Sequence, residues 1–320
     1  FSYANYLNKQ HVYNQIFINS NYKTENITFD FNFYVDKLRQ TLINSFNIHD
    51  FDNESQNFIN AFLFGQRQDV SAEMNENYTQ AGVIHILAIS GLHIAILYGM
   101  LLYLFKAMQL GYKSRYTKLI ITLLFLWTFA FITGLSASVV RSVTMFSIIA
   151  VALTFDRNQN IYNAMAISVL IILLFKPNFI FDVGFQLSYL SVFIIIICNP
   201  LYKKLHFTKY KIVHFIADLV SISLCAQLFL LPVLLYYFHQ FPTLFLVANL
   251  IVIPLSNIIL YALIFVLLLN FIMPAFAIKI GKVLSYLIQK LNEYIEWIAS
   301  FKEFTIQNIP FNELLLLSSY

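Results

Sequence analysis

Two histidines and a Ser-Gly pair lie inside one long apolar stretch of the chain. Residues 85–94, HILAISGLHI, open a run from 83 to 105 that contains no Lys, Arg, Asp or Glu. About 20 apolar residues suffice to cross a bilayer, and polar side chains at that depth generally face a protein interior or a water-filled path. Gly91 allows a bend or a close approach of another backbone, and Ser90 can bond a carbonyl that the bend frees. The pattern therefore predicts a kinked or broken helix that carries a functional site.

The two histidines of this stretch are not placed as a metal-binding pair. His85 and His93 are eight residues apart, so on a straight helix they point about 80° away from each other. Neither has a carboxylate or a cysteine beside it, and we expect neither a metal ion nor another cofactor. We expect them to line a polar path or to bond a neighbouring helix. A neutral imidazole can donate to phosphate, and titration near physiological pH would make such a contact sensitive to pH.

Arg141 stands in another apolar run, just after a turn rich in Ser and Gly at residues 134–138. A guanidinium is planar and always charged, and it binds phosphate with two parallel donors. One interpretation is that Arg141 engages a phosphate at the mouth of a polar path. The alternatives are that it extends to the membrane interface, or that it pairs with Asp182, which also lies near the outer side.

Single amides and hydroxyls recur in the later apolar runs. They could form a strip of hydrogen-bonding groups along one face of a bundle, although each alone is better explained as a contact between helices. Two prolines in the same region favour discontinuous helices of the kind found around transport sites. The polar residues are Gln186, Ser188, Gln227 and Asn249, and the prolines are Pro232 and Pro254.

The composition identifies the class of protein. Hydrophobic residues make up 59% of the 320 residues and charged residues only 11%, whereas a soluble domain is about a quarter charged. Residues 1–82 hold five basic and nine acidic residues, and residues 83–320 hold fifteen basic and seven acidic ones. We therefore expect an acidic aqueous segment followed by a polytopic membrane domain with basic loops. Cys198 and Cys225 both lie in apolar runs, so no disulfide framework is expected.

Basic loops also predict the orientation. The loop that follows the first apolar run carries four basic residues and no acid at 106–118, and a second basic loop occupies residues 203–211. Short loops rich in Lys and Arg stay in the cytoplasm, so residues 1–82 are expected outside. Residues 244–271 are either one kinked span or a re-entrant element followed by a span. The predicted spans cover residues 83–105, 119–133, 139–155, 161–175, 183–198, 213–238 and 244–271.

Residues 33–82 are too polar to span a membrane and are predicted to form amphipathic helices on its surface or against the bundle. One helical period covers residues 33–46 and a second covers 58–63, where Gly65 is expected to end the helix. Asp69 is the cap candidate for a third helical run.

The flanking segments complete the predicted architecture. Residues 1–32 alternate in short pieces, which predicts strands at the end of a small β domain. Residues 274–303 predict an interfacial amphipathic helix that follows the membrane domain at 83–273, and residues 304–320 begin a further, truncated segment. The expected fold is an all-α polytopic membrane protein. It is a helical bundle of about seven spans with kinked or broken helices and interfacial helices.

Several motifs follow one another in a fixed order. They are Phe64-Gly65, HILAISGLHI at 85–94, TGLSASVVRSVTM at 133–145, GFQLSY at 184–189, AQLFLLPV at 226–233 and ANLIVIP at 248–254. In this order they resemble the competence domain of the ComEC family, inner-membrane proteins that admit transforming DNA. The resemblance covers roughly residues 58 to 300. The opening FSYANYL at 1–7 is similar to the end of the family's external OB-like domain.

The resemblance implies a channel in the bacterial inner membrane that passes single-stranded DNA into the cytoplasm. Many members carry a metallo-β-lactamase-like domain proposed to degrade one strand, but this chain has no His-rich motif of that kind. We therefore expect these residues to act as a channel and not as an enzyme, with any nuclease role outside them or in another protein. The chain also has no Walker loop, so force is expected from a cytoplasmic helicase-like ATPase or strand-binding protein. An external DNA receptor is a further expected partner, and assembly as a homo-oligomer is left open.

Two other classes of function fit parts of the pattern. A small-solute secondary transporter or exporter would have the same broken helices and polar groups at mid-membrane depth. A membrane-embedded hydrolase would use His85 or His93 as base, and its support is limited to Ser90 and the distant Asp182. Solute-dependent stabilisation without any effect of DNA would favour the transporter, and loss of activity on one His→Ala change would favour the hydrolase.

Overall fold

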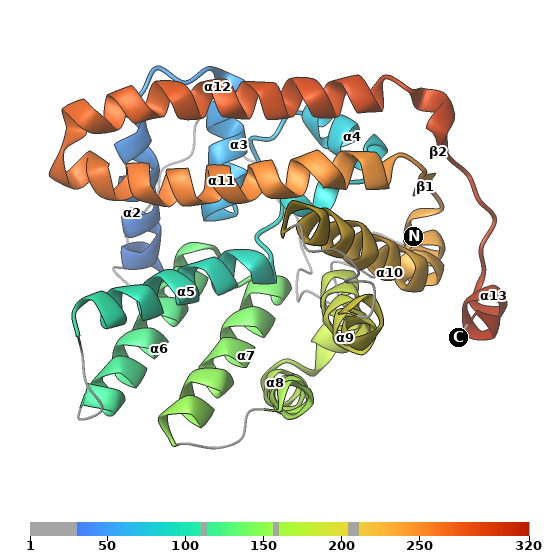
Figure 1. Cartoon of the computed structure of the whole chain (residues 1–320), viewed down its shortest axis with the longest axis horizontal. Helices are drawn as coiled ribbons and strands as arrows, with labels where there is room; N and C mark the ends of the chain where they lie inside the picture. Colours follow the sequence, from blue (N-terminus) through green and yellow to red (C-terminus); the bar gives the residue numbers. More distant parts are fainter. Residues whose placement is uncertain (1–30, 110–113, 156–159, 204–210, 320) are drawn as a thin grey trace, which may run out of the picture.

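The structure is a computed structural model that describes residues 31–109, 114–155, 160–203 and 211–319. These residues fold almost entirely as helices (Figure 1). The predicted β remnant falls on residues outside this part, except that residues 31 and 32 already belong to the first described helix. The helices are α2 (Phe31–Asn44), α3 (Asn53–Phe64), α4 (Ala72–Gln80), α5 (Gly91–Ala107), α6 (Arg115–Ile132), α7 (Ala137–Thr154), α8 (Ile161–Phe175), α9 (Val183–Lys203), α10 (Lys211–Phe238), α11 (Phe245–Ile272), α12 (Pro274–Ala299) and α13 (Glu313–Ser318).

The apolar helices confirm a polytopic membrane protein. Within the described residues, four helices are long and apolar enough to cross a membrane, namely α6, α7, α11 and residues Val213–Phe238 of α10. Shorter apolar helices occupy Gly91–Ala107, Ile161–Phe175 and Val183–Cys198. Each predicted span therefore corresponds to an apolar helix, and the all-α class is confirmed.

The break expected in the first apolar run is present. Ile84–Ile86 forms a short 3-10 turn, and α5 begins only at Gly91. Ser90 is extended (φ −111°, ψ 172°) at the N-cap position of the new helix, and its backbone N–H donates to the side chain of His93, at Nδ1, over 3.2 Å. The run is thus broken, not merely bent, and its polar residues stand at a helix N-terminus.

The two prolines do not break their helices. Pro232 lies inside α10 and Pro254 inside α11, and each helix is continuous. A proline removes one backbone donor, and packed membrane helices tolerate that loss when neighbouring groups satisfy the freed carbonyl. The discontinuity predicted at these positions is therefore wrong. Residues 245–272 form one long helix with no re-entrant element.

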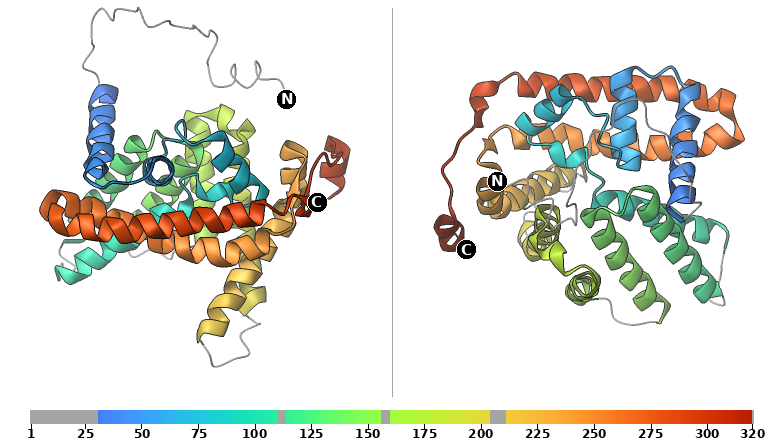
Figure 2. Two further views of the ribbon diagram at one scale, coloured as in Figure 1. Left: turned by 90° about the horizontal axis from the view of Figure 1, so that it is seen from above. Right: turned by 180° about the vertical axis from the view of Figure 1, so that it is seen from behind.

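Helices α11 and α12 form an antiparallel hairpin along the top of Figure 1, with α5 to α9 below it. The apolar stripe of α12 packs against α11, α3 and α4, so this amphipathic helix is covered by protein along its apolar face. Seen from behind, α2, α3 and α4 lie across the hairpin (Figure 2). Two short antiparallel strands pair at the open end of the hairpin. They are β1 (Phe241–Pro242), which precedes α11, and β2 (Thr305–Ile306), which follows α12.

The N-terminal helices have well-defined ends. Asp52 caps α3, and Gly65 ends it in the left-handed conformation (φ 74°), as the sequence predicts. The cap of α4 is Ser71, whose side chain accepts from Met74 N, so the prediction of Asp69 as the cap is wrong. Asp69 instead accepts from Gln66 Nε2. Residues 58–64 of α3 are all buried, so this helix belongs to the protein core.

A candidate polar site where four helices meet

Arg141 lies in the second turn of α7 with only 3% of its surface exposed. Its Nη2 donates to Ser142 Oγ at 2.9 Å, and its Cζ lies 5.6 Å from the centre of the Tyr189 ring on α9. Its Nε is buried and has no hydrogen-bond partner. Within the described residues no carboxylate forms an ion pair with this guanidinium.

Neither alternative for Arg141 holds in the structure. The side chain is buried in protein and does not extend to an interface. Asp182 caps α9 instead of pairing with the arginine, because its Oδ1 accepts the backbone N–H of Phe185 at 2.8 Å. A carboxylate next to a helix N-terminus is favoured by the helix dipole and by the free N–H groups there. The sequence could not distinguish this local partner from a distant one.

Gly91 brings the N-terminus of α5 directly against the arginine. A Cβ at Gly91 would lie 3.0 Å from Arg141 Nη2 and 3.2 Å from Ser142 Oγ. The HILAISGLHI and TGLSASVVRSVTM motifs therefore meet in space at this glycine. The absence of a side chain is what permits the contact.

His93 is held at the same helix end. It is 3% exposed, and its ring stands edge-on to Phe62 with centroids 4.6 Å apart. Its Nδ1 accepts the Ser90 N–H, so in the neutral ring the proton is on Nε2. Nε2 is buried and has no hydrogen-bond partner among the described residues. His85 in the preceding turn is exposed, and no cluster of metal-ligating side chains occurs in the described part of the chain.

Tyr189 is a member of this site that the sequence analysis did not single out. Its ring faces Arg141, and its hydroxyl lies 2.9 Å from Ser168 Oγ on α8. The available signal was its position at the end of the GFQLSY motif, directly after Ser188 and three residues after Gln186, the two residues that the sequence analysis selected. Through Gly91, Arg141, Tyr189 and Ser168 the site joins α5, α7, α9 and α8. We call this group, together with Ser142, the arginine cluster.

The remaining predicted residues are not joined to the arginine cluster by any hydrogen bond or ion pair among the described residues. The side-chain amide of Gln186 is bonded at both ends. Its oxygen accepts from the Tyr237 hydroxyl on α10 at 2.9 Å, and its nitrogen donates to the Ile180 carbonyl at 2.8 Å. Ser188 and Gln227 are half-buried on α9 and α10. Asn249 on α11 is 8% exposed, and its Oδ1 has no partner.

Three of the predicted residues carry buried polar atoms without a hydrogen-bond partner among the residues that the structure describes. In the described part of the chain, six buried side-chain polar atoms lack a hydrogen-bond partner, and three of them are His93 Nε2, Arg141 Nε and Asn249 Oδ1. Buried polar groups are almost always bonded, so each exception requires an explanation. Groups that bond a passing molecule or water would be left open in this way.

The fold and this site define a polytopic helical membrane protein with a buried arginine that no described carboxylate neutralises. The sequence profile of the competence proteins matches residues 62–320, so the chain belongs to the competence protein family, that of ComEC. It is 32% identical over 257 residues to ComE operon protein 3 of Bacillus subtilis. The match covers 79% of this chain and 31% of that protein, so the chain spans about a third of its relative's length. No solved structure matches the chain.

Proposed function

We propose that this chain forms the membrane part of a channel that passes single-stranded DNA into the cytoplasm during natural competence. Membership of the competence protein family supports a role in DNA uptake. The observation that carries the proposal is the coincidence of predicted path residues with unsatisfied buried atoms at His93, Arg141 and Asn249. A polar strand moving through the bundle would supply the missing partners.

In this proposal the protein binds the strand weakly and repeatedly. Conduction requires contacts favourable enough to admit the substrate and weak enough to release it. Three open polar atoms on different helices fit that requirement better than one dense binding site would. The chain acts as a translocator and not as an enzyme, and residues 1–82 lie on the external side of the inner membrane.

Movement needs a source of energy and a source of strand. We propose a cytoplasmic helicase-like ATPase or strand-binding protein as the motor, because the sequence contains no nucleotide-binding loop. An external DNA receptor delivers the substrate. The path is enclosed either by one chain or by several copies in a homo-oligomer. Measuring the oligomeric state of the purified protein would distinguish these two arrangements.

The experiment follows labelled DNA in competent cells that lack this protein, and it scores label in the cytosol separately from label held outside the inner membrane. Loss of cytosolic label with external capture intact supports the proposal. Normal arrival in the cytosol, in cells without a paralogue, overturns it and favours the solute transporter.

A second experiment tests the path residues. Cells carry a variant in which Arg141, His85 and His93 are all replaced by Gln, and Arg115→Gln serves as the control because it removes one positive charge from a half-buried position at the start of α6. We expect slower arrival of DNA in the triple variant alone. A normal rate in the triple variant means that these residues do not line the path.

A further inference from the structure

We propose that the arginine cluster and the N-terminus of α5 together form a binding site for a phosphodiester anion. The inference rests on the proposed function only for the source of the anion, which we take to be the DNA backbone. It adds the chemical group that is recognised and the residues that hold it.

The first argument is charge. Buried ions in proteins are normally paired, since removing a charge from water is costly and a partner of opposite sign offsets much of the cost. Arg141 is almost fully buried, and within the described ranges its guanidinium makes one hydrogen bond, to the neutral Ser142. A water molecule could satisfy the open Nε but would not neutralise the charge. An external anion would do both.

The second argument is that the surroundings of the guanidinium are rich in donors. The N-terminus of α5 carries the positive end of a helix dipole, and the first N–H groups of a helix have no partner inside it. No hydrogen bond from the N–H of Gly91 or Leu92 is present in the described part. Placing this helix end against a buried cation is unfavourable unless an anion lies between or beside them. Phosphate groups bind well at such ends.

The third argument is shape. Gly91 lets the helix end and the guanidinium approach so closely that a Cβ would stand 3.0 Å from Nη2. The planar fork of arginine suits two phosphate oxygens. Because the cluster is buried, a strand reaches it only when the surrounding helices part. A site of this kind reads the charge of the backbone and ignores the base, as a channel for DNA of any sequence requires.

The test measures binding of a short fluorescent oligothymidylate to the purified protein in detergent free of phospholipid. The same strand with neutral methylphosphonate linkages is the comparison. We expect the phosphodiester strand to bind about tenfold or more tightly, in line with hydrogen bonds to a charged group. This preference should largely disappear in Arg141→Gln and remain in Arg115→Gln, which removes an equal charge elsewhere.

Gly91→Ala is the second variant, since it keeps the charge and adds only the Cβ that meets Arg141. It should weaken the preference several-fold, and it decides the question if Arg141→Gln does not fold. A wild-type protein without the preference, or a preference that both variants retain, overturns the site.

Competition distinguishes the sources of the anion. Inorganic phosphate or phosphatidylglycerol that displaces the strand only in proteins with an intact cluster would assign the site to a free or lipid phosphate. If cells lacking the protein import DNA normally while the purified protein keeps its phosphodiester preference, the proposed function fails and the site stands. If import is lost but the preference is absent, the site fails and the function stands.

Discussion

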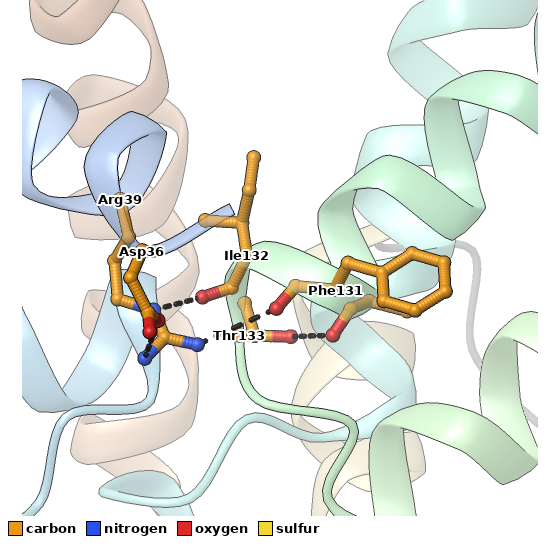
Figure 3. A network of polar contacts seen from close by, with 6 residues as sticks. Asp36, Arg39, Phe131, Ile132 and Thr133 are labelled. Atoms are coloured by element: carbon orange, nitrogen blue, oxygen red, sulfur yellow. Dashed lines mark hydrogen bonds and ion pairs between the residues drawn. The ribbon is translucent and has the colours of Figure 1, made fainter. Parts of the chain in front are cut away.

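Arg39 of α2 donates from Nε to the backbone carbonyl of Ile132 at the end of α6 (Figure 3). Its Nη2 reaches the carbonyl of Phe131 at 3.4 Å, and Asp36 pairs with the same guanidinium at 3.5 Å. The last carbonyls of a helix have no internal partner, and a cation is favoured beside them. This side chain therefore helps to fasten α2 to the α6–α7 hairpin that carries Arg141, beside the ring contact between Phe31 and Phe131.

Arg39→Ala should loosen that attachment. Hydrogen bonds from a charged donor are worth about 1.5–3 kcal/mol, and the partial exposure of Arg39 reduces that value. We therefore expect the free energy of unfolding, measured by thermal denaturation in detergent, to fall by about 1 kcal/mol. Limited proteolysis between α2 and α3 should also become faster. Lys37→Ala removes an exposed charge from the same helix and is the control. Equal stability of the two variants would contradict the role of Arg39.

His49 packs between α11 and α12 near the turn that joins them, where it contacts Asn270 and Gly281. We expect substitutions at His49 and Gly281 to have non-additive effects on stability. Asn270 donates to the Ser45 carbonyl at 2.8 Å, so its Oδ1 accepts from His49 Nε2, which lies 2.9 Å away. A Cβ at Gly281 would lie 2.1 Å from His49 Nδ1. Gly281→Ala should therefore destabilise the protein by about 1–3 kcal/mol, as overpacking does.

The double variant identifies the cause of that loss. In a His49→Ala background, Gly281→Ala meets no ring, and alanine is favoured over glycine within a helix by about 0.5–1 kcal/mol. We expect the second substitution to be neutral or stabilising there. Additive losses in the thermal unfolding of the two single variants and the double variant would show that the contact is not the cause.

Asp52 should make stability depend on pH in the acid range. Burial acts to raise the pKa of its carboxyl, but hydrogen bonds from Ser55 and Gln289 outweigh that effect, and the pKa is lowered from the ordinary value of 3.8. The native state thus favours the carboxylate. Its stabilising contribution is complete above that ordinary value and is lost as the pH falls through the lower native one.

Asp52→Asn keeps an amide oxygen at the cap but removes this titration, whereas Asp52→Ala also removes the cap and should cost about 1 kcal/mol at neutral pH. Unfolding temperatures measured across the acid range should fall more steeply for the wild type than for Asp52→Asn. Parallel pH profiles would show that Asp52 does not titrate differently on folding.

Tyr189 should contribute to stability mainly through its ring. Tyr189→Phe keeps the aromatic face that covers Arg141 and loses only the contact with Ser168, whose hydroxyl still bonds the Met165 carbonyl. Tyr189→Leu removes the face as well, and a desolvated cation–π contact is worth about 2 kcal/mol. The free energy of unfolding, measured by thermal denaturation, should therefore be lower for Tyr189→Leu than for Tyr189→Phe by about 1–2 kcal/mol. Equal effects would mean that the ring does not interact with the guanidinium.

Local sequence was sufficient for the helices and for several of their ends. Runs of apolar residues predict helices at membrane length because a bilayer leaves the backbone no other partner than itself. Gly65 ends α3 because glycine, which has no Cβ, takes the left-handed conformation without strain. The break before Gly91 was predicted from the Ser-Gly pair, but Ser90 contacts the His93 side chain instead of the freed carbonyl expected for it. The motif order was also sufficient for the family.

Partners distant in the chain were not predictable. The sequence left open an ion pair between Asp182 and Arg141, and only the folded chain shows that Asp182 caps α9 instead. His49 and Asn270 are 221 residues apart, and nothing in either segment indicates the other. The covered face of α12 was also beyond the sequence, because an apolar stripe has the same pattern against lipid as against α3, α4 and α11.

The sequence by itself thus determined which segments are helical, where polar residues interrupt them and which family the chain belongs to, because these depend on residues close together along the chain. Only the tertiary structure decided that Gly91 meets Arg141, that Tyr189 covers the guanidinium and that no described carboxylate balances it. Those relations depend on how four helices pack. Packing is set by the combined shapes of many side chains and not by any single motif.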